Sequence, residues 1–279
     1  MKIKILSDST CDLSAALLAE NNVSLIPLTV VKDGVQFKDG VSITPADIFA
    51  HVAAGGDLCS TSANSIGEYE DIFAQYADYD GVIHITIGSG FSSCYQNACV
   101  AAEDYPNVRV VDSRNLSTGQ GLVVLKACEL AKTAADLDAL ADELREFTGK
   151  VEASFLVDKL NYLVKGGRCS AAAALGANLL NLKPCIEVKD GKMTVVKKYR
   201  GNYAKCLANY VKERLEGRED LDHGTLFITQ TIVSDDCYQA VKAAADQYGR
   251  FDHIYETTAG CTVSCHCGPG TLGVLFVRK

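Results

Sequence analysis

The feature that most constrains the fold is an alternation, along the first half of the chain, of short branched apolar runs with amphipathic stretches. The strand-like runs cover residues 2–7, 23–31, 81–87 and 107–112. The helical patterns cover residues 44–56, 92–104, 117–132 and 135–147. Such alternation is typical of a parallel sheet with helices on both faces. We therefore expect residues 1–150 to form a doubly wound α/β domain.

Local signals refine these expectations. Thr44 precedes Pro45, the order favoured by a capping residue and a proline in the first helical turn. Asp12 is expected to cap the helix that follows it. Pro27 lies inside the run 23–31 and predicts an edge or irregular strand, because proline has no N–H for the ladder.

The pattern changes near Gly149. Residues 183–200 alternate around Asp190 and Gly191, a pair that is the strongest short-range signal for a β-hairpin. Other strands are expected at 151–158, 224–231, 251–257 and 270–278, and helices at 171–181, 202–215 and 234–249. This mixture predicts a second α/β domain over residues 151–279, with a mixed, partly antiparallel sheet.

Composition and charge argue against several classes of protein. The formal net charge is −8, whereas non-specific nucleic-acid binding needs a basic surface. No apolar run approaches the roughly 20 residues of a membrane helix. The apolar run at the N-terminus is too short for a signal peptide. We expect a soluble cytoplasmic protein that binds no nucleic acid and does not insert stably into a membrane.

Cysteine is frequent but scattered. The chain has 12 cysteines and no CxxC pair. Disulfide frameworks belong to short secreted chains, so these residues are expected to be small buried hydrophobes. The densest stretch is CTVSCHC, residues 261–267. A structural zinc site needs four ligands, and consecutive residues of an extended chain point to opposite sides. We therefore favour His266 in a glycine turn that faces a ligand head group, with zinc as a remote alternative and no cofactor expected.

Five stretches combine small hydroxyl residues with glycine. They are SDSTCDL (7–13), STSANS (60–65), GSGFSS (88–93), DSRNLSTGQG (112–121) and KGGRCS (165–170). Three of them follow predicted strands, whose carboxyl ends share one edge of the sheet. Hydroxyls, exposed backbone N–H groups and the guanidinium of Arg168 suit an anion. No P-loop or nucleophile elbow is present, and no GxGxxG opens a helix with a partner acid downstream.

Taken together and in order, these stretches resemble the DegV family. The resemblance rests on SDSTCDL at the start, TS near residue 61, SGFS with YQNA near 90, VVDSRNLSTGQG near 111, GGR ending at 168, KP and DG near 184, and HCGPGT from 266. It covers essentially the whole chain and implies the two-domain α/β fold described above.

The resemblance also implies a function. It suggests that the chain binds one long-chain fatty acid and presents it, without catalysis of its own, to the catalytic subunit of a bacterial fatty acid kinase. That kinase, which is dihydroxyacetone-kinase-like, would make an acyl phosphate for phospholipid synthesis. By motif, Thr61 and Ser92 would hold the carboxylate with help from Ser62. Arg168 and His266 would lie at the pocket mouth and face the phosphate or the kinase.

Elementary energetics agrees with this interpretation. Each buried CH₂ contributes roughly 0.8 kcal/mol, so a 16-carbon tail supplies on the order of 10 kcal/mol before association costs. A buried carboxylate needs donors, which neutral hydroxyls provide. Residues 171–188 are the expected pocket wall. The alternative is a hydrolase or transferase acting on a small acyl or phosphorylated substrate, with Ser92 as nucleophile and His266 as base; it requires an acid behind His266.

Overall fold

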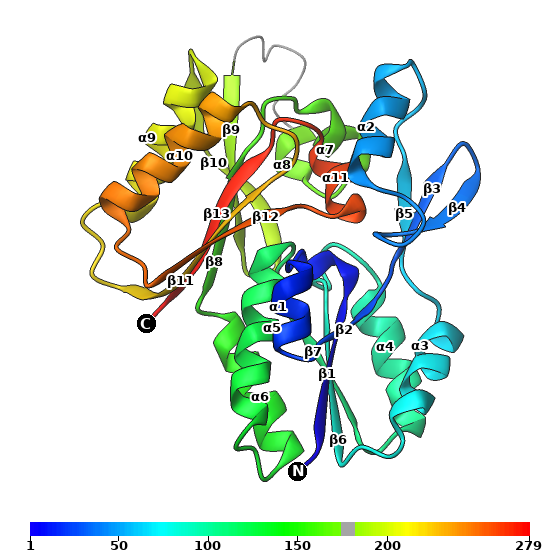
Figure 1. The fold of residues 1–279 in the computed structure, drawn as a ribbon. Helices are drawn as coiled ribbons and strands as arrows, with labels where there is room; N and C mark the ends of the chain where they lie inside the picture. The colour runs from blue at the N-terminus through cyan, green and yellow to red at the C-terminus, as the bar shows by residue number, and fades with distance from the viewer. Residues whose placement is uncertain (174–181) are drawn as a thin grey trace.

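The computed structural model describes residues 1–173 and 182–279 of the chain. Figure 1 shows a parallel sheet in its lower half, a larger mixed sheet at upper left and a small third sheet at upper right. The expected helix over residues 171–181 is described only at its start, as α8 (Ser170–Ala173); residues 174–181 lie outside the described residues.

The parallel sheet forms as the alternation predicts. Its strands are all parallel, in the order β2-β1-β6-β7. They are β1 (Ile3–Asp8), β2 (Ser24–Ile26), β6 (Gly81–Thr86) and β7 (Val108–Asp112). The helices that accompany this sheet are α1 (Ala15–Glu20), α3 (Ile66–Phe73), α4 (Cys94–Ala101), α5 (Thr118–Ala131) and α6 (Leu137–Thr148). In Figure 1, α5 and α6 lie on one side of the sheet and α3 and α4 on the other, which is the doubly wound arrangement.

Two local expectations were wrong in this half. The run 23–31 is two strands, because β2 ends at Ile26 and Pro27 cannot continue its ladder. The next strand, β3 (Thr29–Lys32), belongs to another sheet. The cap of α1 is Ser14, whose Oγ accepts the Leu17 N–H, whereas Asp12 ends a preceding 3₁₀ turn (Ser9–Cys11) at φ 50°. The capping box at Thr44, which opens α2 (Pro45–Ala53), is confirmed.

The small third sheet links the two halves of the chain. It consists of β4 (Val35–Lys38), β3 and β5 (Ser60–Ser62), paired antiparallel. With α2 it packs on α7 (Asn161–Gly166) and α11 (Cys261–Cys267) of the second half. The shared buried cluster comprises Val30, Ile43, Ile48, Phe49, Cys59, Tyr162, Cys261 and Cys265. Residues of the first half therefore pack directly against the second, and the proposed division at residue 150 stays a prediction.

The mixed sheet has the order β10-β9-β8-β13-β11-β12, in which only β11 and β12 pair in parallel. Its strands are β8 (Val151–Leu156), β9 (Leu182–Lys189), β10 (Lys192–Arg200), β11 (Leu221–Gln230), β12 (His253–Thr258) and β13 (Leu272–Arg278). The helices α9 (Tyr203–Leu215) and α10 (Asp235–Tyr248) cover one face. Asp190 and Gly191 both have positive φ, as the hairpin turn requires. The predicted fold class is confirmed.

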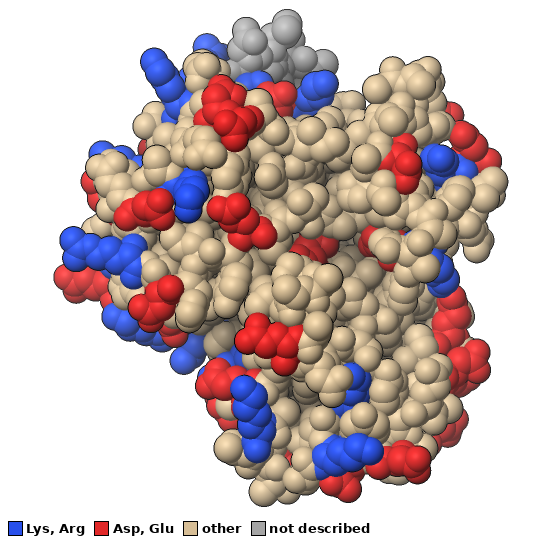
Figure 2. Space-filling model, viewed as in Figure 1, with Lys and Arg blue, Asp and Glu red and all other residues tan. Residues whose placement is uncertain are grey.

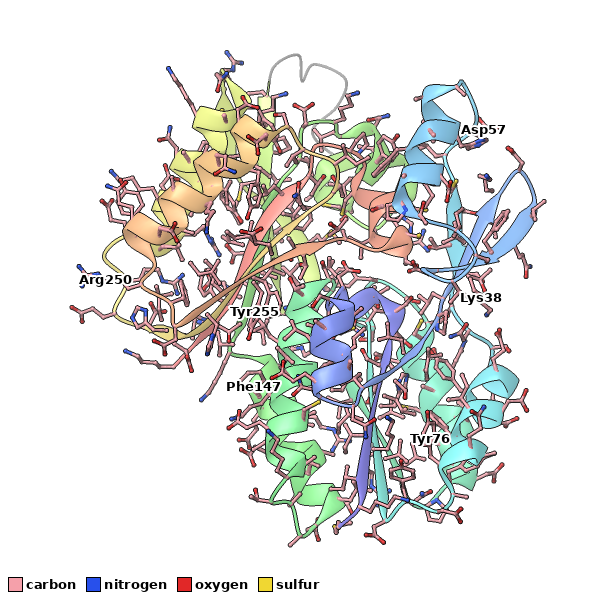
Figure 3. The ribbon with its side chains drawn as sticks, in the orientation of Figure 1. Lys38, Asp57, Tyr76, Phe147, Arg250 and Tyr255 are labelled. Atoms are coloured by element: carbon pink, nitrogen blue, oxygen red, sulfur yellow. The ribbon has the colours of Figure 1, made fainter. Side chains whose placement is uncertain are left out.

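The core is continuous across the junction of the two large sheets. One buried cluster contains residues of the parallel sheet, such as Ile5, together with Phe155 and Leu275 of the mixed sheet. Phe147 on α6 and Tyr255 on β12 pack at the margin of this cluster (Figure 3). All cysteines except Cys99 are buried, as predicted. No helix within the described ranges has the length and apolar character to cross a membrane.

Acidic and basic side chains are mixed over the face shown in Figure 2, and acidic residues predominate in the chain, 35 against 27. Such a surface offers a polyanion little overall attraction.

Candidate functional site

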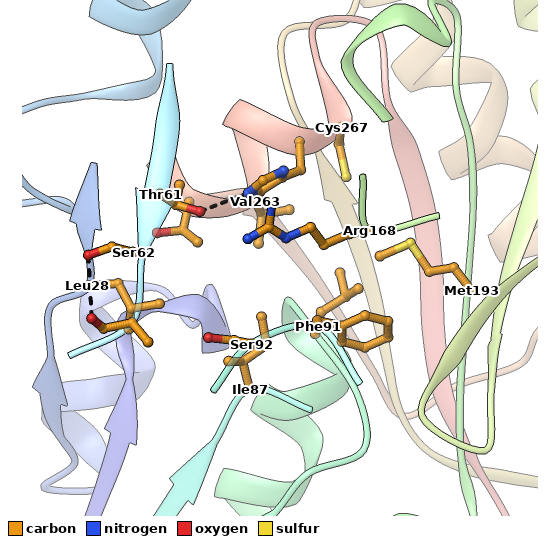
Figure 4. Close-up of a pocket in the computed structure, with 14 residues that line it drawn as sticks. Leu28, Thr61, Ser62, Ile87, Phe91, Ser92, Arg168, Met193, Val263 and Cys267 are labelled. Atoms are coloured by element: carbon orange, nitrogen blue, oxygen red, sulfur yellow. Dashed lines mark hydrogen bonds between the residues drawn. The ribbon is translucent and has the colours of Figure 1, made fainter. Parts of the chain in front are cut away.

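One cavity brings together all five predicted site residues. Thr61, Ser62, Ser92, Arg168 and His266 line a space of about 520 Å³, a volume that includes its open part (Figure 4). They come from β5, from the loop between β6 and α4, from the residues after α7, and from α11. The remaining lining is largely apolar and includes Leu28, Ala63, Ile87, Phe91, Leu116, Met193, Val263 and Cys267. A polar mouth therefore opens onto an apolar interior.

Thr61 and Ser62 are held by the small sheet. Thr61 pairs with Val30 of β3 in an antiparallel ladder, which fixes the backbone on one side. Downstream, the Asn97 side chain donates a hydrogen bond of 2.8 Å to the Asn64 carbonyl oxygen. Both ends of this short segment are thus tied to the body of the protein.

The loop that carries Ser92 is held by two carboxylates at strand ends. Asp8, at the end of β1, accepts the Ile87 N–H at 3.0 Å. Asp112, at the end of β7, accepts the Ser89 N–H at 3.0 Å. These bonds explain the acidic residues in two of the five stretches picked from the sequence.

The hydroxyl of Ser92 is oriented by its neighbour. Its Oγ accepts the Cys94 N–H at 3.3 Å and lies 3.1 Å from the Cys94 Sγ. The single hydroxyl proton can be donated either to the Cys94 Sγ or to an anion in the cavity.

His266 lies in the last turn of a helix, not in a glycine turn. Residues 261–267 form α11, so the expectation of an extended chain was wrong. The imidazole Nε2 lies 2.8 Å from the Thr61 Oγ1. Burial, and to a lesser extent the charge of Arg168, lowers the pKa of His266 to about 4. The ring is therefore neutral near pH 7.

The glycines of KGGR have a packing role. A Cβ on Gly166 would lie 2.5 Å from the Nδ1 of His266, so only glycine allows α7 to approach the imidazole this closely. Gly167 has φ 70° and ends α7 in the left-handed conformation. Arg168 is exposed, and its guanidinium donates to the Gly166 carbonyl oxygen at 2.7 Å. The turn places an exposed positive charge beside the cavity.

The geometry bears on the zinc-site and hydrolase alternatives. Cys261 and Cys265 belong to the cluster that packs on the small sheet, whereas His266 faces the cavity. Within residues 1–173 and 182–279, no group of three metal-ligating side chains could hold an ion. His266 contacts Thr61 rather than Ser92, and its Nδ1 has no hydrogen-bond partner among the described residues. The acid required by the hydrolase alternative is therefore not seen in the described structure.

A second cavity lies next to the first. It spans about 380 Å³, again including its open part, and shares Leu116, Val263 and Cys267 with the first. Its other lining residues are Ser117, Ala153, Phe155, Val188, Thr229, Gln230, Thr231, Ala259, Thr271, Gly273 and Leu275. The cavity thus lies between the start of α5 and the mixed sheet.

Sequence reasoning located the mouth better than the interior. Of the expected wall 171–188, only Val188 is among the lining residues, and 174–181 fall outside the described residues. Phe91, Met193 and Val263 were missed. The only signal for Val263 is its spacing of three residues from His266, which becomes informative once 261–267 is known to be a helix.

Comparisons with known proteins agree with this architecture. The family model described as "Uncharacterised protein, DegV family" matches residues 2–279. A DegV domain-containing protein of Clostridium acetobutylicum is 32% identical over 285 residues, covering 100% of this chain and 99% of that protein.

Solved structures show the same fold. A fatty-acid-binding DegV family protein from Thermus thermophilus is 28% identical, with a TM-score of 0.90 and full coverage of both chains. DegV of Bacillus subtilis, a fatty acid binding protein, is 26% identical, with a TM-score of 0.82 and full coverage of both chains. A stearic-acid-binding protein from Eubacterium ventriosum is 25% identical, with a TM-score of 0.82, covering 99% of this chain and 98% of that one. The chain therefore belongs to the DegV family.

Proposed function

We propose that this chain binds one long-chain fatty acid, with its carboxylate at the mouth of the cavity and its tail in the interior. The observation that carries the proposal is a hydroxyl-lined mouth on an apolar cavity that shares Leu116, Val263 and Cys267 with a second, adjacent apolar cavity. The fatty-acid-binding relatives from Thermus thermophilus and Bacillus subtilis, which share the whole fold, support it.

The head group is matched by neutral donors. Thr61 and Ser92 present hydroxyls to the cavity, and Ser62 adjoins them. A carboxylate removed from water needs such donors, because an unpaired buried charge is very costly. His266 is neutral and offers no fixed counter-charge, so a bound carboxylate stays available as a nucleophile. The binding role of these hydroxyls is part of the proposal.

The tail is matched by the interior. The shared lining residues are buried: Leu116 lies just before α5, and Val263 and Cys267 lie on α11. The mixed sheet supplies further buried lining, such as Phe155 and Leu275. At roughly 0.8 kcal/mol per buried CH₂, a 16-carbon tail contributes on the order of 10 kcal/mol before the cost of association. Apolar burial therefore dominates the affinity, and the mouth determines the orientation.

The exposed mouth fits a substrate-presenting subunit in the bacterial cytoplasm. We propose that the partner is the catalytic subunit of a fatty acid kinase. There a carboxylate oxygen would attack the γ-phosphorus of ATP, the bond to the bridging oxygen would break, and ADP would leave. Arg168 is exposed beside the cavity, and its planar fork suits the new phosphate. The acyl phosphate would then enter phospholipid synthesis.

Native mass spectrometry tests lipid binding. We expect delipidated protein mixed with palmitate to gain the mass of one fatty acid and to release it on denaturation. A protein whose mass is unchanged at saturating palmitate, or that takes up several molecules with no limit, would contradict the proposal. Addition of the kinase subunit and ATP then tests presentation: acyl phosphate should form only when this chain is present.

A further inference from the structure

SDSTCDL is the stretch picked from the sequence whose residues do not line the cavity. Its two acidic residues are nevertheless buried, with Asp8 fully inaccessible and Asp12 7% exposed. Asp8 holds the Ser92 loop, as described above. The role of Asp12 becomes clear at the other end of the chain.

The first N–H groups of α11 are bound by carboxylates from the opposite half of the protein. Gly260 donates its N–H to Asp12 at 2.8 Å. Cys261 and Thr262 donate theirs to the two oxygens of Asp39 at 2.8 and 3.1 Å. The helix has no side-chain cap of its own, because the residue at its start is Gly260. These bonds satisfy the donors that a helix leaves unpaired at its beginning.

Both carboxylates are themselves fixed. Asp12 accepts the Ser117 hydroxyl at 2.5 Å, and Asp39 accepts the Ser9 hydroxyl at 3.0 Å. Neither forms an ion pair with any described basic side chain. Their partners are therefore backbone dipoles and hydroxyls, which are directional.

The contact is close enough to select the residue at the start of α11. A Cβ on Gly260 would lie 3.0 Å from one Asp12 oxygen and 3.5 Å from an Asp39 oxygen. Glycine therefore makes room for the Asp12 oxygen, whereas the distance to Asp39 would be an ordinary van der Waals contact. The arrangement depends on residues about 220 to 250 positions apart in the chain.

At its other end the same helix carries the site. Val263, His266 and Cys267 line the cavity at helical spacings of three and four. Cys261 and Cys265 lie in the cluster with the small sheet. A seven-residue helix held at its start and packed on one face has little freedom to rotate, so its start determines where the imidazole meets Thr61.

We propose that Asp12 and Asp39 are positioning residues that hold α11 so that His266 meets the Thr61 hydroxyl in the fatty acid site. The expected effect on lipid binding rests on the proposed function. The placement of the His266 imidazole does not, because it can be measured without any ligand.

The test uses NMR titration of the histidine rings in the ligand-free full chain, with His266 assigned by its loss in His266→Gln. We expect Asp12→Ala and Asp39→Ala to raise the pKa of His266 from about 4 toward 6.5, because a loosened helix admits water to the imidazole. Palmitate affinity should fall about tenfold, because a loosened α11 no longer holds Val263, His266 and Cys267 in place around the cavity.

Two variants separate positioning from general stability. Asp12→Asn keeps an oxygen for the Gly260 N–H and can donate to the Ser117 oxygen, so it should retain the His266 pKa and the affinity. Asp136 caps α6 in the same way, accepting the Ala139 N–H at 2.8 Å, and α6 carries no lining residue. Asp136→Ala should therefore lower stability and leave the His266 pKa unchanged.

An unchanged His266 pKa in both Asp12→Ala and Asp39→Ala, or an equal shift in Asp136→Ala, would overturn the proposal. Should the alanine variants fail to fold, Asp39→Asn takes their place. It keeps the bond to Cys261 and loses the one to Thr262, so an intermediate shift is expected and no shift would contradict the inference. Absence of palmitate binding in the wild-type protein would instead refute the proposed function and leave this measurement valid.

Discussion

The mouth of the cavity and its interior are built in different ways. The mouth collects Thr61, Ser92, Arg168 and His266 from four separated segments. The interior is lined by strands and a helix that belong to the ordinary core, namely β8, β13 and α11 among others. The difference teaches that polar placement here depends on long-range hydrogen bonds, whereas apolar space depends on packing.

Filling the interior should have the largest effect. Val263 lines both cavities where they meet, so Val263→Phe should block the path of the tail. Excluding even half of a 16-carbon tail forfeits several kcal/mol, and we expect palmitate affinity to fall at least 100-fold. Isothermal titration calorimetry measures the loss. Val100→Phe, at an exposed position of α4, is the control, and equal affinities in the two variants would place the tail elsewhere.

The second prediction concerns the side chain of Asp12, which binds the start of α11. Burial raises the pKa of Asp12 from 3.8 to about 8, and nearby Asp39 adds to this, against the bonds from Ser117 and Gly260. Between pH 3.8 and about 8, Asp12 therefore carries a proton in the folded protein but not in the unfolded chain. This contribution to stability is complete below pH 3.8 and declines as the pH rises through that window.

Asp12→Asn removes this titration. Relative to the wild-type protein it should gain stability progressively from pH 4 to pH 8, by on the order of a few kcal/mol. Urea unfolding at several pH values measures the difference. If Asp12 were ionised in the folded protein at all these pH values, the difference in free energy of unfolding between Asp12→Asn and the wild-type protein would not change with pH.

Removing one donor from the mouth should have a smaller effect. Ser92→Ala deprives the carboxylate of one hydroxyl, which is worth roughly 1.5–3 kcal/mol when the acceptor is charged. We expect palmitate affinity to fall by about 10- to 100-fold in a calorimetric titration. Ser93→Ala, at the exposed next position, should bind as the wild-type protein does. Unchanged affinity in Ser92→Ala would remove Ser92 from the site.

The smallest effect on lipid binding is expected at the exposed guanidinium. Arg168→Ala should change palmitate affinity by no more than about twofold, because charges in contact with water contribute little. Acyl phosphate formation with the kinase subunit and ATP should nevertheless be lost. A strong loss of affinity in this variant would show that Arg168 binds the resting carboxylate, and normal phosphorylation would remove it from the kinase step.

The contrast between local and long-range interactions also explains which features the sequence could predict. Alternation of strands and helices gave the parallel sheet, and Asp190-Gly191 gave the hairpin, because these depend on neighbouring residues. The five mouth residues were found through the family resemblance and the small hydroxyl stretches, and they do meet.

Other features could not be predicted because their partners are distant in the chain. The helix at residues 261–267 has no side-chain cap, and its start is bound by Asp12 and Asp39, more than 200 residues away. Asp12 was expected to cap its own neighbouring helix, a local role that Ser14 performs instead. The interior lining was missed because buried apolar residues look alike whether or not they border a cavity.

The most direct test of the central claim is a crystal structure of the chain grown with palmitate. We predict one palmitate per chain, with its carboxylate oxygens within hydrogen-bond distance of Thr61 and Ser92 and its tail passing Val263 and Cys267 into the second cavity. A fatty acid bound in the reverse direction or outside these cavities, or no bound fatty acid at saturating palmitate, would contradict the account.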